Sequence, residues 1–406
     1  MIKYIEGGVC AAKGCRAGGI HCGIRKNKTK KDLSLIVSDK EASAAAVYTT
    51  NLVCGAPIKV TRSNISDGIA RAMICNSGNA NTCNADGIQI AEAMCDLVYK
   101  STGIPAKDVI VASTGVIGQK LDITPIANGM DALVAGLSYE GSDDAAWGIM
   151  TTDTKLKSVA VEFEIGGKTC HIGGIAKGSG MIHPNMATML VFVTSDVAIT
   201  PDALNAALKE DVQNSFNMIS VDGDTSTNDM LSVMANGMAG NPMIDENSHD
   251  FATFKEALFA VTSKLCRAIA ADGEGATKLL ECNVSGAADK QTARTVAKSV
   301  ICSSLFKAAM FGADANWGRV LCAIGYSGAK VDVNTIGVSF ASKAGEIEVC
   351  RGGAGVDFSE EKAKEILLCD EIQVNITLGM GDESATAWGC DLTYDYVKIN
   401  GDYRTS

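Results

Sequence analysis

The sequence predicts a mixed α/β protein built from more than one lobe. Apolar residues make up 47% of the 406 residues and charged residues 20%, with 42 glycines and 6 prolines, which is typical of a compact α/β protein. Segments rich in β-formers alternate with helical segments along the whole chain. Because a single hydrophobic core stops growing at roughly 250–300 residues, we expect at least two lobes.

In the first half of the chain the expected elements follow a strand, turn and helix order. Residues 32–37 and 108–112 read as strands, and an amphipathic helix over about residues 88–99 lies between them. A further helix begins at Thr200, a good N-cap that is followed by proline and aspartate in the first turn. The apolar strand that starts near Thr188 therefore leads through a turn into this helix.

The C-terminal part, residues 285–406, reads as a separate β-α-β lobe. A helix begins at Ser359 and ends near Leu368, and an alternating strand follows over residues 372–378. Residues 1–284 then form the first and larger domain.

Charge and composition exclude several classes of partner. The net charge of −11 repels phosphate backbones and anionic membranes, so we expect no nucleic-acid role, and the basic run 25–31 reads as a solvated loop between two strands. The sequence has no apolar run of signal-peptide or membrane-spanning length, so we expect a cytoplasmic protein.

The cysteines do not indicate disulfides or a metal site. Fifteen cysteines are scattered along the chain, and we expect them to be reduced and mostly buried. Cys10, Cys15, His21 and Cys22 lie close together in sequence but lack the spacing of a structural zinc site, so we expect no metal there.

Residues 177–193 combine a glycine-rich loop containing a proline with an apolar strand, and Thr188 stands where the two meet. A threonine hydroxyl is a poor nucleophile, and one remedy is a free α-amine on the same residue that acts as its base. That remedy requires cleavage between Ala187 and Thr188. The Thr188 hydroxyl can attack the carbonyl of the small Ala187, and water then hydrolyses the resulting ester. The alternative is that Thr188 merely opens a β-branched strand.

Two other loops supply groups that acyl transfer needs. Thr114 and Gly115 follow a strand and offer a hydroxyl and a backbone N–H to a tetrahedral oxyanion; an ordinary strand-ending turn is the alternative. Glu274 stands between glycines and is a candidate for binding an ammonium group, with a solvent-facing turn acid as the alternative. The sequence contains no nucleotide-binding motif and no defensible Ser/His/Asp pattern, so we expect no cofactor and no conventional triad.

Several blocks in order along the chain resemble the ornithine acetyltransferases of arginine biosynthesis, also called the bifunctional glutamate N-acetyltransferases. The blocks are residues 76–81, 113–118, 150–154, 177–190, 221–229, 273–278, 312–319 and 400–405. The resemblance covers the full chain. It implies a four-layer α/β/β/α sandwich of the aminopeptidase and ornithine-acetyltransferase type, with a smaller C-terminal α/β lobe whose tail returns to the active site.

The resemblance also implies an N-terminal-nucleophile enzyme that cleaves itself between Ala187 and Thr188. The α chain, 1–187, and the β chain, from 188, then stay together as a heterotetramer of two α and two β chains. Thr188 carries the acetyl group in a ping-pong transfer from N2-acetylornithine to glutamate, and Thr114 and Gly115 form the oxyanion hole. The substrate contacts implied by position are Thr151, Lys177, Thr188, Glu274, Asn400 and Thr405.

The sequence leaves three alternatives open. A threonine-nucleophile amidohydrolase or aminopeptidase of related fold would use the same chemistry with water as acceptor. A glycine-rich metabolite-binding protein would leave Thr188 uncut. Acetyl-CoA as an additional acetyl donor would make the enzyme bifunctional. His183, five residues before the nucleophile, suggests a further hypothesis: its titration near neutral pH affects the rate of cleavage.

Overall fold

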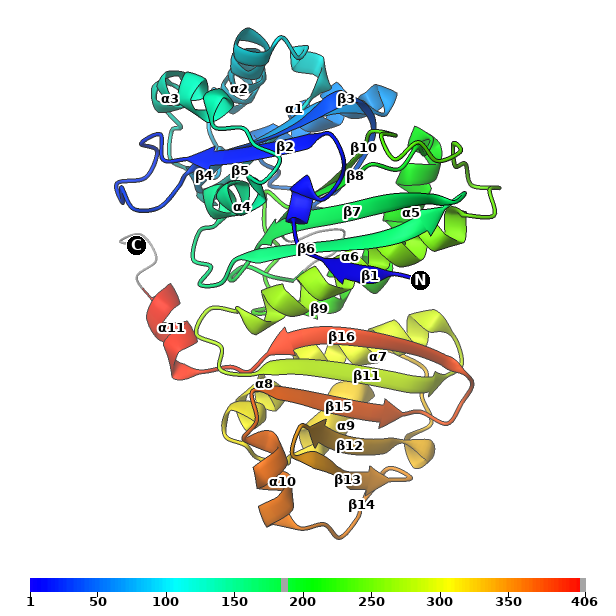
Figure 1. Ribbon diagram of the computed structural model, residues 1–406. Helices are drawn as coiled ribbons and strands as arrows, with labels where there is room; N and C mark the ends of the chain where they lie inside the picture. The colour runs from blue at the N-terminus through cyan, green and yellow to red at the C-terminus, as the bar shows by residue number, and fades with distance from the viewer. Residues whose placement is uncertain (184–188, 402–406) are drawn as a thin grey trace. The chain divides into compact units, whose positions relative to one another are not determined.

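The computed structural model describes residues 1–183 and 189–401 (Figure 1). The chain divides into two compact units, and each contains one β-sheet with helices packed on it, as expected for a mixed α/β protein. Unit 1 comprises Met1–Gly178, Pro184–Phe216 and Thr225–Leu265; unit 2 comprises Ser179–His183, Asn217–Asp224 and Cys266–Ser406. The domain boundary that we placed at residue 285 falls inside strand β11 (Leu279–Ala287), a strand within the sheet of unit 2.

Unit 1 is built on a nine-stranded sheet in the order β1-β6-β7-β8-β10-β3-β4-β5, with β2 paired to β3. Its strands are β1 (Lys3–Ile5), β2 (Cys15–Ile20), β3 (Leu33–Tyr48), β4 (Ile69–Asn79), β5 (Val109–Val116), β6 (Lys157–Ile165), β7 (Lys168–Lys177), β8 (Leu190–Ser195) and β10 (Met230–Ala235). Its helices are α1 (Ala56–Asn64), α2 (Gly87–Thr102), α3 (Thr124–Ala135), α4 (Ser142–Ile149), α5 (Pro201–Asn214) and the first part of α6 (Phe251–Ala271). The pairs β4–β5 and β8–β10 are parallel.

The long strand β3 connects the two halves of this sheet. Its first part pairs with β2 and β4, its last part pairs with β10, and the register with β4 shifts between Val37 and Ala42. Such an irregularity bends a strand. The bend lets β2–β5 form one layer while β6, β7, β8 and β10 form another (Figure 1).

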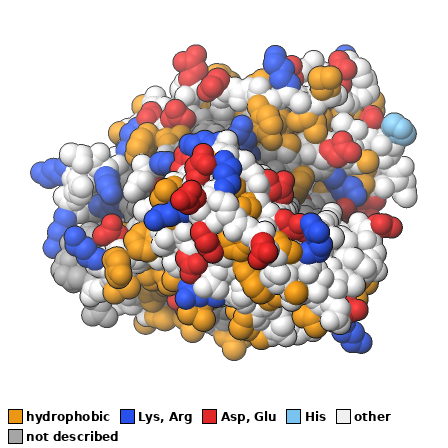
Figure 2. All heavy atoms as spheres, turned by 90° about the horizontal axis from the view of Figure 1, so that it is seen from below, with side chains coloured by type: hydrophobic (Ala, Val, Ile, Leu, Met, Phe, Trp, Pro, Cys, Tyr) orange, Lys and Arg blue, Asp and Glu red, His pale blue; other side chains and the backbone are white. Residues whose placement is uncertain are grey.

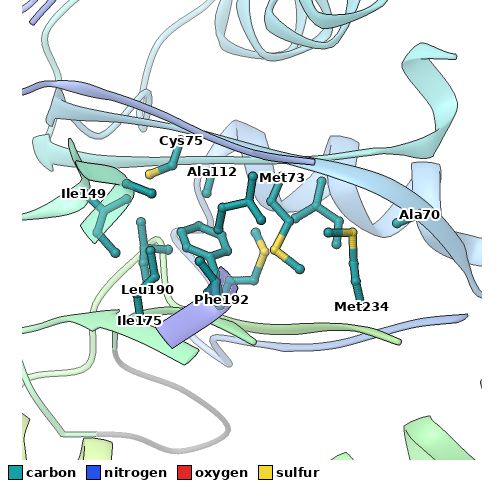
Figure 3. Close-up of a cluster of buried hydrophobic side chains, with 14 of the residues drawn as sticks. Ala70, Met73, Cys75, Ala112, Ile149, Ile175, Leu190, Phe192 and Met234 are labelled. Atoms are coloured by element: carbon teal, nitrogen blue, oxygen red, sulfur yellow. The ribbon is translucent and has the colours of Figure 1, made fainter. Parts of the chain in front are cut away.

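The main core of unit 1 lies between these two layers (Figure 3). Met73 and Ala112 from one layer face Ile175 and Phe192 from the other, and all four are almost fully buried. A second core joins β3–β5 to α2 and α3 on the outer side. On the opposite side, α5 and α6 cover the other layer (Figure 1). The four-layer α/β/β/α sandwich that the resemblance implied is therefore confirmed.

Unit 2 contains a seven-stranded sheet in the order β14-β13-β12-β15-β11-β16-β9. The strands other than β11 are β9 (Ile219–Ser220), β12 (Gly337–Ser342), β13 (Gly345–Arg351), β14 (Ala354–Gly355), β15 (Glu371–Thr377) and β16 (Glu383–Cys390). The helices are α7 (Lys290–Cys302), α8 (Ser304–Phe311), α9 (Trp317–Gly325), α10 (Glu360–Leu367) and α11 (Tyr394–Asn400). On the face shown in Figure 2, acidic and basic side chains are interspersed, and no large basic patch is visible there.

The local predictions agree with these elements. The predicted helix over 88–99 is α2, and the helix that begins at Thr200 is α5, where the Thr200 hydroxyl accepts the Ala203 N–H at 3.3 Å. Ser359 caps α10 in the same way, at 3.2 Å from the Lys362 nitrogen. The basic run lies between β2 and β3, and the fifteen cysteines are free. Among the described helices none is long and apolar enough to cross a membrane.

Candidate active site

Thr114 and Gly115 lie at the C-terminal end of β5, beside the end of its parallel neighbour β4. Gly115 has φ of +132°, and a Cβ on it would lie 2.3 Å from the carbonyl carbon of Gly78. Only glycine fits this close approach. The sequence pattern predicts a strand that ends near Ala112, but the close approach of Gly78 and Gly115 lets the pairing continue to Val116.

The residue before Thr114 is held on two sides. The Ser113 hydroxyl donates to Asn76 Oδ1 at 2.6 Å, and the Ser113 carbonyl accepts from Asn228 Nδ2 at 3.0 Å. Thr114 itself is 9% exposed, and its hydroxyl makes no hydrogen bond to any residue in 1–183 or 189–401. The backbone at Thr114 is therefore fixed, while its hydroxyl remains available as a donor.

Asp153 ties together the segments that carry Thr151 and Lys177. One carboxylate oxygen accepts the Thr151 N–H at 3.0 Å, and the other accepts the Gly178 N–H and the Lys157 ammonium, both at 2.7 Å. The side chains of Asp153 and Lys157 are fully buried. Burial alone would raise the pKa of Asp153, but the charges of Lys177 and Lys157 and the hydrogen bonds outweigh it and hold that pKa below its ordinary value.

Arg25 connects this segment to the end of β5. Its guanidinium donates to the Met150 carbonyl, next to Thr151, and a Cβ added to Gly78 would lie 2.8 Å from the Arg25 Cγ. Gly78 in turn contacts Gly115. The structure thus brings Thr114, Gly115, Thr151 and Lys177 into one connected neighbourhood within unit 1.

Strand β8, which begins shortly after residue 188, pairs with the end of β7 that carries Lys177. Leu190 pairs with Lys177 across β7 and β8, and the Met230 N–H donates to the Met189 carbonyl at 2.8 Å. Ala187 and Thr188 lie outside the described residues, as does Thr405.

Asp229, directly before β10, is a buried acid in the same unit. Burial raises its pKa well above the ordinary value, although hydrogen bonds from Ser226 and the charge of Lys177 oppose that shift. Its Oδ2 has no hydrogen-bond partner in the part of the chain that the structure describes. Burial thus favours the protonated form of Asp229, whereas the pKa of Asp153, the other acid that the Lys177 charge affects, is lowered.

In unit 2, Glu274 and Asn400 are brought together. Glu274 is 7% exposed, and its Oε2 accepts the Asn400 side-chain amide at 2.9 Å. The carboxylate packs on Gly180, where an added Cβ would lie 2.3 Å from Oε2. The alternative of a solvent-facing turn acid is therefore wrong for Glu274.

His183, also in unit 2, is held by polar neighbours. Its Nδ1 lies 3.1 Å from Ser220 Oγ and 3.5 Å from Cys302 Sγ. Burial and the nearby Lys298 charge lower the pKa of His183 to about 4. A pKa of about 4 does not fit the hypothesis that His183 titrates near neutral pH.

No group of three or more potential metal ligands occurs among the described residues. His21, one member of the early cysteine and histidine cluster, places Nδ1 3.0 Å from the Lys30 carbonyl and 3.2 Å from Asp32. These contacts give His21 a structural role in the loop between β2 and β3.

In the sequence, neither Asp153 nor Asn228 is marked as an individual site residue; each lies within one of the blocks that carry the resemblance. The signal available for Asp153 was Lys157, an opposite charge four residues later. Asn228 offered no comparable signal, because the carbonyl groups that it binds come from distant parts of the chain.

The comparisons with known proteins agree with one another. The sequence profile of the ArgJ family matches residues 16–405. The arginine biosynthesis bifunctional protein ArgJ of Caldanaerobacter subterraneus subsp. tengcongensis is 48% identical, and that of Symbiobacterium thermophilum is 50% identical; each match covers 100% of both chains. A crystal structure of the arginine biosynthesis bifunctional protein ArgJ from Bacillus halodurans is 46% identical with a TM-score of 0.50, and the match covers 52% of this chain and 98% of that chain. A profile that matches nearly every residue, and relatives of this identity over their whole length, show that the chain belongs to the ArgJ family.

Proposed function

We propose that this protein transfers the acetyl group of N2-acetylornithine to glutamate through an acetyl ester on Thr188, as a step of arginine biosynthesis. The observation that carries the proposal is the match over residues 16–405 to a family whose members are named arginine biosynthesis bifunctional proteins. Thr114, Gly115, Thr151 and Lys177, which acetyl transfer would use, share one neighbourhood in unit 1.

Self-cleavage between residues 187 and 188 is part of the proposal. The relatives match this chain over its full length. In contrast, 98% of the crystallised chain from Bacillus halodurans aligns with only 52% of this chain. A cut before Thr188 divides the 406 residues nearly in half. A half-length chain from a full-length family is what such a cut would produce.

The proposed reaction has two balanced halves. The Thr188 hydroxyl attacks the acetyl carbonyl of N2-acetylornithine while the α-amine of Thr188 takes its proton, and ornithine leaves with that proton as the C–N bond breaks. The α-amino group of glutamate then attacks the ester, and the Thr188 oxygen regains a proton. An α-amine with a pKa of about 7.7–8.0 can both accept and return this proton near neutral pH.

The Thr114 hydroxyl and the Gly115 N–H would stabilise the oxyanion in both halves. Lys177, Thr151, Glu274, Asn400 and Thr405 keep their proposed roles as substrate contacts on the strength of the resemblance. We further propose a cytoplasmic heterotetramer of two α and two β chains that needs no cofactor. The word bifunctional in the names of the relatives supports acetyl-CoA as a second acetyl donor.

Intact-mass spectrometry of the purified protein, with and without N2-acetylornithine, tests the proposal. We expect two chains that meet between residues 187 and 188, and an acetyl adduct on the chain that begins with Thr188. A fully active chain in one piece without an adduct would contradict the proposal.

The acceptor of the acetyl group, glutamate or water, distinguishes the transferase from the hydrolase alternative. We expect sustained release of ornithine only when glutamate is present, whereas a hydrolase would release acetate from N2-acetylornithine alone. Glutamate with acetyl-CoA in place of N2-acetylornithine tests the second donor in the same assay.

A further inference from the structure

We infer that Asn228 is a positioning residue for acetyl transfer, because its side-chain amide holds the end of β5 that presents Thr114 and Gly115. The inference rests on the proposed oxyanion role of those two residues. Asn228 would act through Thr114 and Gly115 without touching the substrate.

The Asn228 amide uses all of its hydrogen-bonding capacity. Its Nδ2 donates to the Ala80 carbonyl at 2.6 Å and to the Ser113 carbonyl at 3.0 Å, while its Oδ1 accepts from the hydroxyls of Thr82 at 2.5 Å and Thr227 at 2.7 Å. Since the carbonyls can only accept, the amide has one orientation. Asn228 is 6% exposed, so water competes little with these bonds.

The bond to Ser113 closes a row of contacts along the open edge of β5, which is the last strand of its sheet. Asn64 binds the Val109 carbonyl at 2.8 Å, and the Thr61 hydroxyl bonds to both the N–H and the carbonyl of Val111. These two residues lie in α1 and cover the start and middle of the strand. The catalytic end is covered by Asn228, which comes from a distant part of the chain.

Asn228 also belongs to the segment that leads into β10. Met230, two residues later, donates its N–H to the Met189 carbonyl at 2.8 Å and pairs with Leu190. One short segment thus binds the end of β5 and the beginning of β8. Its geometry sets the separation between the oxyanion donors and the strand that begins after residue 188. Donors act only when they are held at the oxyanion position before the reaction occurs.

The test compares Asn228→Ala with Asn64→Ala, a matched loss of a side-chain amide at the other end of the same strand edge. For cleaved Asn228→Ala protein we expect kcat to fall by about 10- to 100-fold, with less than about a threefold change in KM for N2-acetylornithine. For Asn64→Ala we expect kcat within about twofold of the parent, even if its urea unfolding midpoint falls by as much as that of Asn228→Ala. Equal losses of kcat in the two variants would overturn the inference.

A double variant distinguishes this inference from the proposed function. If Asn228 acts through Thr114, adding Asn228→Ala to Thr114→Ala should lower kcat by less than about threefold. A full, additive loss would overturn the positioning role. Unchanged kcat in Thr114→Ala alone would instead remove the oxyanion assignment, which belongs to the proposed function.

Thr82→Val provides a milder variant if Asn228→Ala does not fold. It removes one of the two donors to Asn228 Oδ1 and keeps the side-chain volume, so we expect a fall of a few-fold in kcat with unchanged KM. Unchanged kcat in folded Thr82→Val, together with a fall in Asn64→Ala, would overturn the inference.

Discussion

Different physical constraints explain why position 114 is a threonine and position 115 a glycine. Gly115 is required by the backbone, whereas Thr114 contributes a hydroxyl that binds nothing else in the described chain. Removing one oxyanion donor costs about 2.7–4 kcal/mol of barrier, so Thr114→Ala should lower kcat by about two to three powers of ten. Steady-state kinetics measure this. Thr61→Val, which removes a hydroxyl bonded to β5 at Val111, should leave kcat nearly unchanged; equal losses would contradict the assignment of Thr114.

The structural role of Asp153 and its expected effect on substrate binding can be separated. Asp153→Asn removes the carboxylate that pairs with the buried Lys157 ammonium, and breaking a buried ion pair typically costs about 3–5 kcal/mol of stability. It also weakens the bonds to the N–H groups of Thr151 and Gly178, so KM for N2-acetylornithine should rise severalfold. Urea unfolding and KM report the two effects.

The double variant Asp153→Asn/Lys157→Met is the control for that prediction. Removing the buried ammonium should restore much of the stability while KM stays high. If KM recovers together with stability, Asp153 supports only the fold.

At the residue scale, the sequence can reveal a candidate site residue when the residues next to it in the chain are unusual. Glu274 stands between glycines, and Thr114 precedes one, so both could be singled out. Asn228 could not be, because its role depends on the Ala80 and Ser113 carbonyls, which reach it only after β4 and β5 pair.

At the scale of the elements, the close approach of β4 and β5 predicts which glycine the fold requires. Gly115→Ala would force a Cβ to 2.3 Å from the Gly78 backbone, so we expect the strand ends to separate and the protein to lose several kcal/mol or fail to fold. Gly118→Ala is the matched control, because Gly118 also has a positive φ, +76°, but open space around it. Its cost should be about 1–2 kcal/mol in urea unfolding. Similar costs for the two variants would contradict the steric explanation.

The packing of α5 against α6 makes stability depend on pH. Asp211 on α5 accepts hydrogen bonds from Thr262 and Ser215 at 2.9 and 2.8 Å, and burial raises its pKa to about 7. Between about pH 4 and 7 the unfolded chain releases this proton while the folded protein keeps it, so stability falls as pH rises through this window. Above pH 7 the loss is complete. Asp211→Asn should flatten this part of the profile, measured by urea unfolding at each pH; an unchanged slope would contradict the assignment.

Helix ends and strand positions could be predicted from local chemistry, as Thr200 and Ser359 illustrate. The layering could not be predicted in the same way. It depends on the bend in β3, a strand of 16 residues that the sequence suggested only over residues 32–37. The bend results from pairing with strands on both sides, and such partners are not visible in a local pattern.

The strand order of unit 1 has a consequence for the whole molecule after the proposed cut. β8 and β10 would belong to the second chain, yet they lie between β7 and β3, which belong to the first. The two chains should therefore co-elute in size-exclusion chromatography, also at high salt, and separate only in denaturant. Separation in native buffer would contradict this. Thr188→Ala, which blocks the cut, is the single-chain control.

The same interleaved sheet distinguishes the first folding of the protein from any later one. Before the proposed cut, β7 and β8 belong to one polypeptide, so their pairing is an intramolecular event. After the cut, a denatured sample contains two separate polypeptides that must find each other, so recovery becomes second order in protein concentration. Dilution should slow the renaturation of the cut protein and leave that of Thr188→Ala unaffected. The proposed cut would thus make the mature enzyme dependent on a connection that it no longer possesses.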